Sequence, residues 1–389
     1  MTLYQNPTSA AEESFNAKVA IVMPVYNEGA TIESTVMEIK EKVISRMPNA
    51  SIFIFEDGSK DNTKEAIIAL ADRFPWIRAH TSPERKGYPR AVKDAIASID
   101  ESEYGYIVFM DSDGQYDPND FFKLWDLMLS DNDLDIVMAR RTNRAEPAYR
   151  VILSSGLRVI EKVLFSPPCK DVTSAFRLMK TGVAKEIARQ VKYSKYNFWL
   201  EFTARMSKEN YRVMEVEIPY RSREGEEKGK SKVYSVKRMP RILRNELGAV
   251  FRTWLEYNKS QFSKFLGVGI SGSAVILLLT YLLTNILNQF YIVSAGIAIE
   301  ASIIWAFFLN DRWTFKGTES NSPWYSRLVR YNLVSMLGLV INELILLTLA
   351  VVFRWYYLLG EVIGIIGAFA FNYLANLKWT WRSTSRKLH

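Results

Sequence analysis

Residues 106–115 read YIVFMDSDGQ, five apolar residues followed by an acidic segment. The apolar run predicts a buried strand, and Asp111-Ser112-Asp113 follows at its carboxyl end, with Gln115 two residues further on. This spacing predicts that Asp111, Asp113 and Gln115 share one side of an extended segment. Two carboxylates and an amide are oxygen ligands suited to Mg²⁺ or Mn²⁺ held together with substrate phosphates. For an isolated Asp-x-Asp a solvated acidic turn is the stronger interpretation, so the metal site depends on the motifs around it.

Three further motifs lie upstream, each beside a predicted strand or helix. Strands predicted at 19–25 and 51–55 are followed by Tyr26-Asn27-Glu28-Gly29 and by Glu56-Asp57-Gly58-Ser59-Lys60-Asp61, and Arg85-Lys86-Gly87 precedes a predicted helix. Asp61 is a candidate helix cap, and a cation with a glycine before a helix suits a diphosphate. The alternation of strands and helices predicts an open, mostly parallel sheet, in which ligands lie beyond the carboxyl ends of the strands. We therefore expect all four motifs to converge on one crevice.

Together these motifs resemble a known family. Pro24-x-Tyr26-Asn27-Glu28, Glu56-Asp57-Gly58-Ser59-x-Asp61 and Asp111-x-Asp113-x-Gln115 are similar to the signature of family 2 glycosyltransferases, above all dolichol-phosphate mannose synthases and related polyprenyl-phosphate glycosyltransferases. The resemblance covers about residues 18–235. It implies a GT-A fold, which is an α/β fold with a Rossmann-like, mostly parallel sheet. It also implies a nucleotide sugar, GDP-mannose or UDP-glucose, and a polyprenyl or dolichyl phosphate as substrates. The family usually has two aspartates where this chain has Glu56-Asp57.

The resemblance also implies roles for individual residues. It assigns the nucleotide sugar to Pro24, Tyr26, Glu28, Asp57 and Asp111, the metal to Asp113 and Gln115, and the lipid phosphate to Arg141, Arg150 and Ser154. The residues expected to carry catalysis are Asp111, Asp113, Arg141 and Arg150. Position in the chain adds Phe55 near the base, Lys86 beside the diphosphate, and Lys232 at the lipid phosphate. Lys232 lies in a Gly- and charge-rich segment whose lysines would close over the phosphates, with a solvated linker as the alternative. Residues 171–177 resemble the Asp-x-x-Ser-Gly-Phe-Arg segment of the family, with Ala175 in place of the glycine.

The last third of the chain has the composition of a membrane domain. Four apolar spans, each near the ~20 residues needed to cross a bilayer, are predicted at 262–287, 291–309, 328–353 and 356–377. Basic residues precede the first span, lie between the second and third, and follow the fourth, which predicts that both ends of this domain and the catalytic domain are cytoplasmic. The expected organisation is a disordered tail at 1–17, a catalytic domain at 18–235, an interfacial amphipathic helix at 236–260 and an all-α transmembrane domain of four helices at 261–389.

The membrane domain repeats internally. Asn310-Asp311-Arg312-Trp313-Thr314-Phe315 ends the second span, and Asn376-Leu377-Lys378-Trp379-Thr380-Trp381 ends the fourth, 66 residues later. This offset predicts a duplicated two-helix hairpin, and the pattern resembles GtrA-like membrane domains. Glu300, near mid-span, is expected to face the bundle interior or a headgroup cavity. Close helix contacts are expected at four glycines: Gly267, Gly269, Gly272 and Gly338.

Composition restricts the remaining function classes. The 389 residues carry a net charge of +8, and Cys169 is the only cysteine, so no intrachain disulfide forms. Residues 1–17 lack the apolar core of a secretory signal. The basic and aromatic stretch 237–257 is typical of a helix at the surface of membrane lipids. No recognised nucleic-acid module accompanies it, so no nucleic-acid partner is expected.

The histidine count bears on mechanism. The chain has two histidines, His80 and His389, and neither lies in a motif. A phosphate monoester, with a second pKa of about 6, is ionised enough to attack a sugar without a general base. We therefore expect a single displacement that inverts the anomeric carbon and gives a β-linked polyprenyl-phosphate hexose. The alternatives are a processive polysaccharide synthase, whose Gln-x-x-Arg-Trp segment is absent, a lipid-linked sugar translocase built on the membrane domain, and a donor-binding scaffold. The sequence leaves mannose and glucose, and the polyprenol, open.

Overall fold

The chain forms two compact units, Met1–Trp254 and Leu255–His389. The computed structural model describes residues 18–142, 148–221, 238–317 and 322–382, with the backbone alone for 148–154. The tail predicted at 1–17 lies outside the described residues. The boundary between the units falls within the segment predicted as an interfacial helix, 236–260. A single helix, Met239–Tyr281, runs through this boundary.

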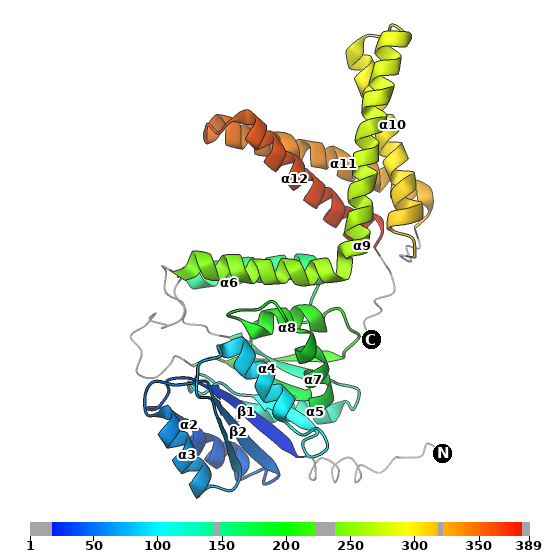
Figure 1. Ribbon diagram of the computed structural model, residues 1–389. Helices are drawn as coiled ribbons and strands as arrows, with labels where there is room; N and C mark the ends of the chain where they lie inside the picture. The colour runs from blue at the N-terminus through cyan, green and yellow to red at the C-terminus, as the bar shows by residue number, and fades with distance from the viewer. Residues whose placement is uncertain (1–17, 143–147, 222–237, 318–321, 383–389) are drawn as a thin grey trace, which may run out of the picture. The chain divides into compact units, whose positions relative to one another are not determined.

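Within the described residues, the first unit is built on one seven-stranded sheet (Figure 1). The strands are β1 (Val19–Val25), β2 (Ala50–Glu56), β3 (Ile77–Thr81), β4 (Tyr106–Phe109), β5 (Ile136–Thr142), β6 (Arg177–Lys180) and β7 (Val213–Pro219). Their order is β3-β2-β1-β4-β6-β5-β7, and β6 runs antiparallel to β4 and β5, whereas the other pairs are parallel. The predicted mostly parallel α/β sheet is confirmed. All seven residues of β1 are buried, as expected of a parallel strand covered on both faces.

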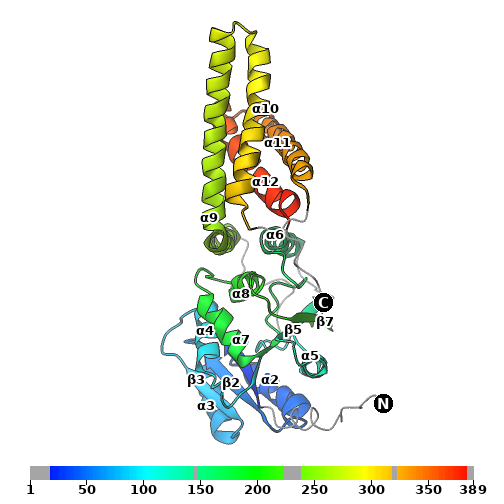
Figure 2. The ribbon, with the colours of Figure 1, turned by 90° about the vertical axis from the view of Figure 1, so that its right-hand side faces the viewer.

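Helices cover both faces of this sheet. On one face, α2 (Ile32–Ile39), α3 (Thr63–Arg73) and α5 (Asp120–Ser130) share a core with alternate residues of β1 and β2. On the other face, α4 (Tyr88–Ser98) and α7 (Thr181–Gln190) pack against the sheet and against α8 (Phe198–Met206) (Figure 2). A further helix of the first unit, α6 (Ala148–Phe165), follows β5 along the chain. Burial of each large apolar side chain contributes about 1.5–3 kcal/mol, so both layers hold the carboxyl ends of the strands in place.

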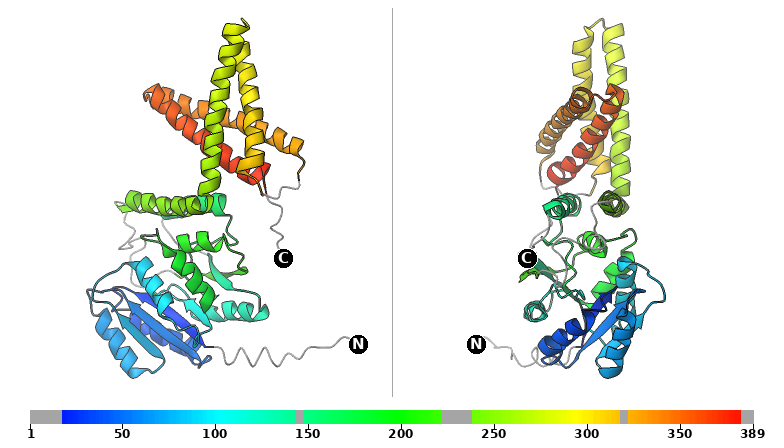
Figure 3. Two further views of the ribbon diagram at one scale, coloured as in Figure 1. Left: turned by 45° about the vertical axis from the view of Figure 1, so that its right-hand side comes forward. Right: turned by 90° about the vertical axis from the view of Figure 1, so that its left-hand side faces the viewer.

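The second unit is helical (Figure 3). Its helices are α9 (Met239–Tyr281), which begins in the first unit, α10 (Tyr291–Leu309), α11 (Trp324–Leu347) and α12 (Tyr357–Ala375). Each continues into a π-helical turn, at Leu282–Ile286, Asn310–Thr314, Thr348–Val352 and Asn376–Thr380. Within the described residues, these four helices are long and apolar enough to cross a membrane, as predicted from the four spans. The predicted interfacial helix and first span are parts of the one helix α9.

Two glycines mark close helix contacts at equivalent places, 66 residues apart. The Ser302 hydroxyl of α10 donates to the Gly272 carbonyl of α9 (2.9 Å), and a Cβ at Gly272 would lie 2.9 Å from that hydroxyl oxygen. A Cβ at Gly338 of α11 would lie 2.3 Å from Asn372 Oδ1 of α12. The predicted contacts at these two glycines are confirmed. Those at Gly267 and Gly269 are wrong, since among the described residues no atom of a neighbouring helix lies within 4 Å of a Cβ built there.

Glu300 differs from the sequence prediction. It is exposed on the helical unit, and its Oε2 accepts a hydrogen bond from Asn332 Nδ2 (3.2 Å), which joins α10 to α11. The expectation that it faces the bundle interior is therefore wrong: the residue lies at the edge of the α10–α11 contact, where the amide of Asn332 reaches it.

Candidate active site

Hydrogen bonds join the loops that follow β1 and β2. The Asn27 N–H donates to Ser59 Oγ (3.0 Å), and the Lys60 N–H donates to Asn27 Oδ1 (2.8 Å). The Glu28 N–H donates to Thr63 Oγ1 (2.9 Å) at the start of α3. Asn27 has a φ of 55°, a left-handed conformation that asparagine adopts more readily than most residues. The first two motifs therefore meet, as their places after neighbouring parallel strands predicted.

Asp61 belongs to this junction rather than to a helix cap. Asn62 occupies the N-cap position of α3, without a capping bond from its side chain, so the predicted cap position was wrong by one residue. The Asp61 carboxylate accepts the Thr63 N–H (3.1 Å) and the Gly29 N–H (3.3 Å). It thus ties the β1 loop to the first turn of α3.

Asp57 holds the Arg85-Lys86-Gly87 segment against the end of β2. Its two carboxylate oxygens accept the Lys86 N–H (2.7 Å) and the Gly87 N–H (2.9 Å), and the residue is 5% exposed. Gly58 has a φ of 64°, and a Cβ there would lie 2.5 Å from the Arg85 nitrogen. Only glycine fits this position, because the conformation is left-handed and the two backbones touch. The third motif therefore joins the first two.

Other residues in or beside the predicted nucleotide-sugar site also have partners within the protein. The Arg85 guanidinium lies 3.9 Å from the Tyr26 ring centroid, and Lys86 Nζ pairs with Asp94 (2.6 Å) in an exposed ion pair. The Phe55 ring stacks on His80 with centroids 4.5 Å apart. Burial, with the nearby Arg78, lowers the pKa of His80. Glu56, the departure from the family pattern, accepts the backbone N–H groups of Ser59 and Ser82.

The acidic segment after β4 is a tight turn. Gly114 has a φ of 67°, and the Gln115 N–H donates to Asp113 Oδ1 (3.2 Å). The predicted extended segment is therefore wrong, because the Asp113 side chain and Gly114 bend the chain there. Ser112 is buried, and its hydroxyl donates to the Pro24 carbonyl (3.3 Å), which places the turn beside the end of β1. All four motifs thus lie at one edge of the sheet.

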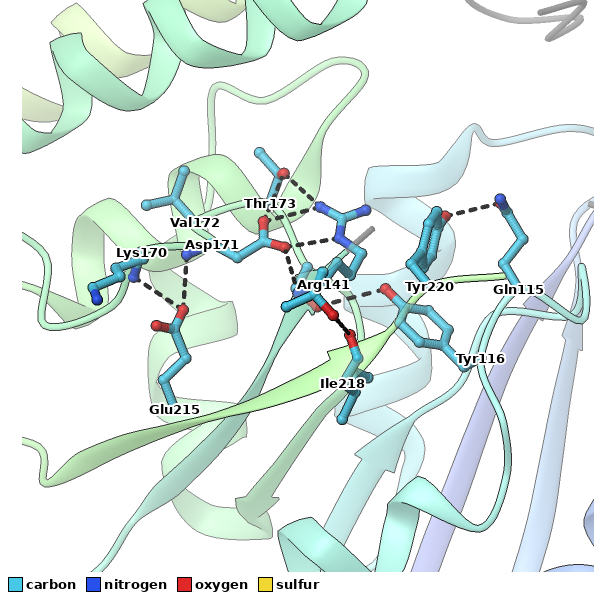
Figure 4. A network of polar contacts seen from close by, with 12 residues as sticks. Gln115, Tyr116, Arg141, Lys170, Asp171, Val172, Thr173, Glu215, Ile218 and Tyr220 are labelled. Carbon is cyan, nitrogen blue, oxygen red and sulfur yellow. Dashed lines mark hydrogen bonds and ion pairs between the residues drawn. The ribbon is translucent and has the colours of Figure 1, made fainter. Parts of the chain in front are cut away.

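Arg141, near the end of β5, is clamped by the segment that precedes β6 (Figure 4). Its Nε and Nη2 donate to the two oxygens of Asp171 (2.8 and 3.0 Å), and Nη2 also donates to Thr173 Oγ1 (2.9 Å). The Arg141 side chain is 11% exposed and that of Asp171 is 2% exposed. Asp171 is positioned in turn by its own N–H, which donates to Glu215 of β7 (2.8 Å). The guanidinium is therefore buried and fixed in orientation.

Tyr220 links this arginine to the acidic turn. Its hydroxyl donates to Gln115 Oε1 (2.8 Å), and its ring centroid lies 5.3 Å from the guanidinium carbon of Arg141. Figure 4 shows the ring between the two side chains. Burial, followed by the charge of Tyr116 and Asp113, raises the pKa of Tyr220 above its ordinary range, so the phenol remains a donor. The Tyr220 side chain thus connects the acidic turn, which carries Asp111 and Asp113, with the fixed guanidinium of Arg141.

The comparisons with known proteins agree with both units. Residues 20–188 match the model "Glycosyl transferase family 2", and residues 264–386 match "GtrA/DPMS, transmembrane domain". The chain carries a family 2 glycosyltransferase domain and a GtrA/DPMS transmembrane domain. It is thus a membrane protein, and the resemblance read from its motifs is confirmed.

Among curated proteins, this glycosyltransferase is similar to a dolichol-phosphate mannosyltransferase of Pyrococcus furiosus, with 27% identity over 94% of this chain and 99% of the relative. It is 25% identical to a dolichyl-phosphate beta-glucosyltransferase of Dictyostelium discoideum, over 54% of this chain and 68% of the relative. A polyprenol monophosphomannose synthase of Mycolicibacterium smegmatis is 27% identical over 53% of this chain and 78% of the relative. Among solved structures, glucosyl-3-phosphoglycerate synthase of Mycobacterium tuberculosis has a TM-score of 0.47 and 14% identity, over 65% of this chain and 86% of that chain.

Of the four residues assigned to the lipid phosphate, only Arg141 is described with its side chain. Arg150 and Ser154 lie on α6 one turn apart, and the structure describes their backbone alone. Lys232 lies outside the described residues. Tyr220 and the pairing of Asp171 with Arg141 were not predicted from the sequence. A signal for Tyr220 exists, because it directly follows β7, a strand parallel to β5, and so reaches the same edge of the sheet.

A second buried arginine, Arg177, stabilises the segment that holds Arg141. Arg177 is fully buried and donates to the carbonyls of Ser174 (2.7 Å) and Val172 (3.0 Å), which fixes the segment that carries Asp171. Its guanidinium also lies 4.8 Å from the Trp199 ring centroid.

Glu161 of α6 is fully buried, and neither of its carboxyl oxygens has a hydrogen-bond partner in the described part of the chain. Burial raises the pKa of Glu161 well above its ordinary value, although the charge of Arg177 opposes this rise.

Proposed function

We propose that this glycosyltransferase transfers a hexose, mannose or glucose, from a nucleotide sugar to a polyprenyl or dolichyl phosphate, with inversion to a β-linked product. The observation that carries the proposal is the adjacency of the acidic turn and Arg141, which Tyr220 bridges. The turn suits a cation-bound diphosphate, and the arginine suits an anionic nucleophile. The names of the relatives support the same donor and acceptor classes.

The donor set of the turn fits a hard divalent cation. Asp111, Asp113 and Gln115 would hold Mg²⁺ or Mn²⁺, because their carboxylate and amide oxygens are the ligands these ions prefer. The described residues contain no group of three or more His, Cys, Asp or Glu side chains suited to a metal, so these residues supply only part of a coordination shell. Mg²⁺ is commonly bound by one or two carboxylates together with substrate phosphates, which agrees with this set. When bound, the ion would neutralise the diphosphate leaving group.

Arg141 would position the acceptor phosphate. Three of its five N–H donors go to Asp171 and Thr173, and within the described residues the two donors on Nη1 have no partner. A guanidinium fixed in this way presents a phosphate with donors of defined direction. Arg150 and Ser154, on the first turns of α6, would add to the same phosphate site. Prepositioning an anion reduces the entropy lost on reaching the transition state.

The displacement needs no general base from the chain. An oxygen of the phosphate dianion would form the bond to the anomeric carbon, and the bond from that carbon to the diphosphate oxygen would break. No proton moves, so the position of His80, stacked on Phe55, is consistent with the absence of a base from this step. A single in-line displacement inverts the anomeric centre, and an α-linked donor gives a β-linked product.

We place the catalytic unit on the cytoplasmic face. The loop between α10 and α11 and the end of α12 carry most of the basic residues around the helices, and the positive-inside rule assigns such segments to the cytoplasm. The proposed acceptor is itself a membrane lipid, so this location brings its phosphate to the enzyme.

A screen tests the proposal. The purified full-length protein would be incubated with polyprenyl phosphate, Mn²⁺ and either GDP-mannose or UDP-glucose, and the lipid product identified by mass. We expect one of the two donors to yield a polyprenyl-phosphate hexose, and Asp113→Ala to reduce the rate about 100-fold or more. Full activity in EDTA would remove the metal from the account. Sugar-lipid flipping in vesicles without added nucleotide sugar, and no product in the screen, would favour a translocase instead.

A further inference from the structure

Tyr220 touches both halves of the proposed site. Its hydroxyl reaches Gln115 on the donor side, and its ring faces Arg141 on the acceptor side. The backbone fixes its place: β7 pairs with β5, and the Tyr220 N–H donates to the Thr142 carbonyl (3.1 Å). The Tyr116 ring packs against it with centroids 5.3 Å apart. Tyr220 therefore has little freedom to leave the contact.

The orientation of the Gln115 amide is set from both of its ends. Its Nε2 donates to the Arg221 carbonyl (3.3 Å), so its Oε1 is the atom that accepts from Tyr220. The Arg221 N–H also donates to the Gln115 carbonyl (2.9 Å), which ties the backbone of the turn to the end of β7. An amide oxygen has two acceptor sites, and Tyr220 occupies one of them. The other remains for a ligand.

We propose that Tyr220 is a positioning residue of the transfer reaction. In this role its hydroxyl fixes the Gln115 oxygen as a ligand for a divalent cation, and its ring braces the Arg141 guanidinium for the acceptor phosphate. The inference rests on the proposed function and adds a residue that couples the two substrate halves. Protein groups that ligate metals are themselves commonly held by outer hydrogen bonds, and loss of such a partner typically costs about 10- to 100-fold in metal affinity or activity.

Two substitutions separate the hydroxyl from the ring. Tyr220→Phe removes the hydroxyl and keeps the ring beside Arg141, whereas Tyr220→Leu removes both. Mn²⁺ affinity would be measured by electron paramagnetic resonance with the full-length protein and a nucleoside diphosphate. We expect both variants to bind Mn²⁺ about 10-fold or more weakly. In rate measurements, Tyr220→Leu alone is expected to raise the KM for polyprenyl phosphate as well.

Tyr116→Phe is the matched control, because its hydroxyl faces Ser174 at 3.5 Å and makes no bond to Gln115. We expect it to bind Mn²⁺ as the wild type does. A second test places Tyr220→Phe in a Gln115→Ala background. If the hydroxyl acts through the Gln115 oxygen, Tyr220→Phe causes no further loss of Mn²⁺ affinity in that background.

The outcomes distinguish the inference from the proposed function. Normal Mn²⁺ affinity in Tyr220→Phe, beside clear binding by the wild type, overturns the inference alone. An undiminished effect of Tyr220→Phe in the Gln115→Ala background also overturns it, because the hydroxyl then acts elsewhere. A wild-type protein that binds no Mn²⁺ with the nucleotide overturns the metal part of the proposed function, and the inference with it.

Discussion

Replacing Asp171 by asparagine would test the arginine clamp at its centre. The Asp171 carboxylate accepts from Arg141 Nε and Nη2 and from the Arg141 backbone N–H (3.3 Å). Asparagine has nearly the same shape but keeps one acceptor oxygen and turns an NH₂ donor toward the other contacts. Arg141 then remains buried without an anionic partner, and its direction is no longer fixed.

The structure sets the size of the effect. A hydrogen bond to a charged group contributes about 1.5–3 kcal/mol, and a factor of ten in affinity corresponds to about 1.4 kcal/mol. If the misdirected Arg141 loses one such bond to the lipid phosphate, the KM for polyprenyl phosphate should rise about 10- to 100-fold. The same change removes half of a buried ion pair, which typically destabilises a protein by about 3–5 kcal/mol, so the thermal midpoint has to be measured alongside.

The assay combines initial rates across a polyprenyl-phosphate series with calorimetric titration of the nucleotide sugar and metal. Asp133→Asn is the matched control: it removes one charge from an exposed pair with Arg212 (2.7 Å), a kind of pair that contributes about 0–1 kcal/mol. We expect Asp171→Asn to bind nucleotide normally and to need more acceptor. A folded Asp171→Asn protein that loses nucleotide affinity but keeps its acceptor KM would refute the assignment of Arg141 to the lipid phosphate.

Three further predictions follow from single features. Gly58→Ala should weaken nucleotide binding about 10-fold or more, because a Cβ there meets the Arg85 backbone, whereas Gly105→Ala, with open space around its Cβ, should leave the calorimetric affinity unchanged; equal affinities would contradict this. Glu161→Gln should change the pH dependence of stability. The folded wild type keeps the Glu161 proton that the unfolded chain loses near pH ~4.3, so its stability relative to the variant should fall by up to about 1.4 kcal/mol per pH unit as pH rises and level off above the raised pKa; parallel melting curves over that range would disprove the burial argument. Tags at the amino terminus and at 317–322 should be accessible from the cytoplasm only, and the 284–291 turn from outside only; the reverse pattern would overturn the assigned topology.

Much of the fold was predictable because it depends on local patterns. Continuous apolar runs such as Val19–Val25 predict buried strands, and parallel strands place the loops that follow them at one edge, which brought Asn27 and Ser59 together. The four long apolar spans predict the helices of the second unit in the same way. Local turn geometry was harder, since Gly114 and the Asp113 side chain bend a segment whose alternation resembles an extended strand.

The acceptor half of the site was not predictable to the same degree. The Asp171 carboxylate meets Arg141 from 30 residues away, and Tyr220 meets Gln115 from 105 residues away, so neither contact leaves a periodic trace in the sequence. Glu161 and Arg177 are buried charged residue types, which composition alone would assign to the surface. These positions follow from the sheet order, which brings β5, β6 and β7 together.

Following the oxygen atoms of the acceptor tests the central claim most directly. The lipid phosphate would carry ¹⁸O, and the full-length enzyme would be supplied with its nucleotide sugar and metal. If the phosphate attacks the anomeric carbon, every labelled oxygen remains in a polyprenyl monophosphate hexose, the nucleoside diphosphate is released without label, and the sugar is β-linked. Label in the released nucleotide, a polyprenyl diphosphate sugar with nucleoside monophosphate, or an α-linked product would contradict the account.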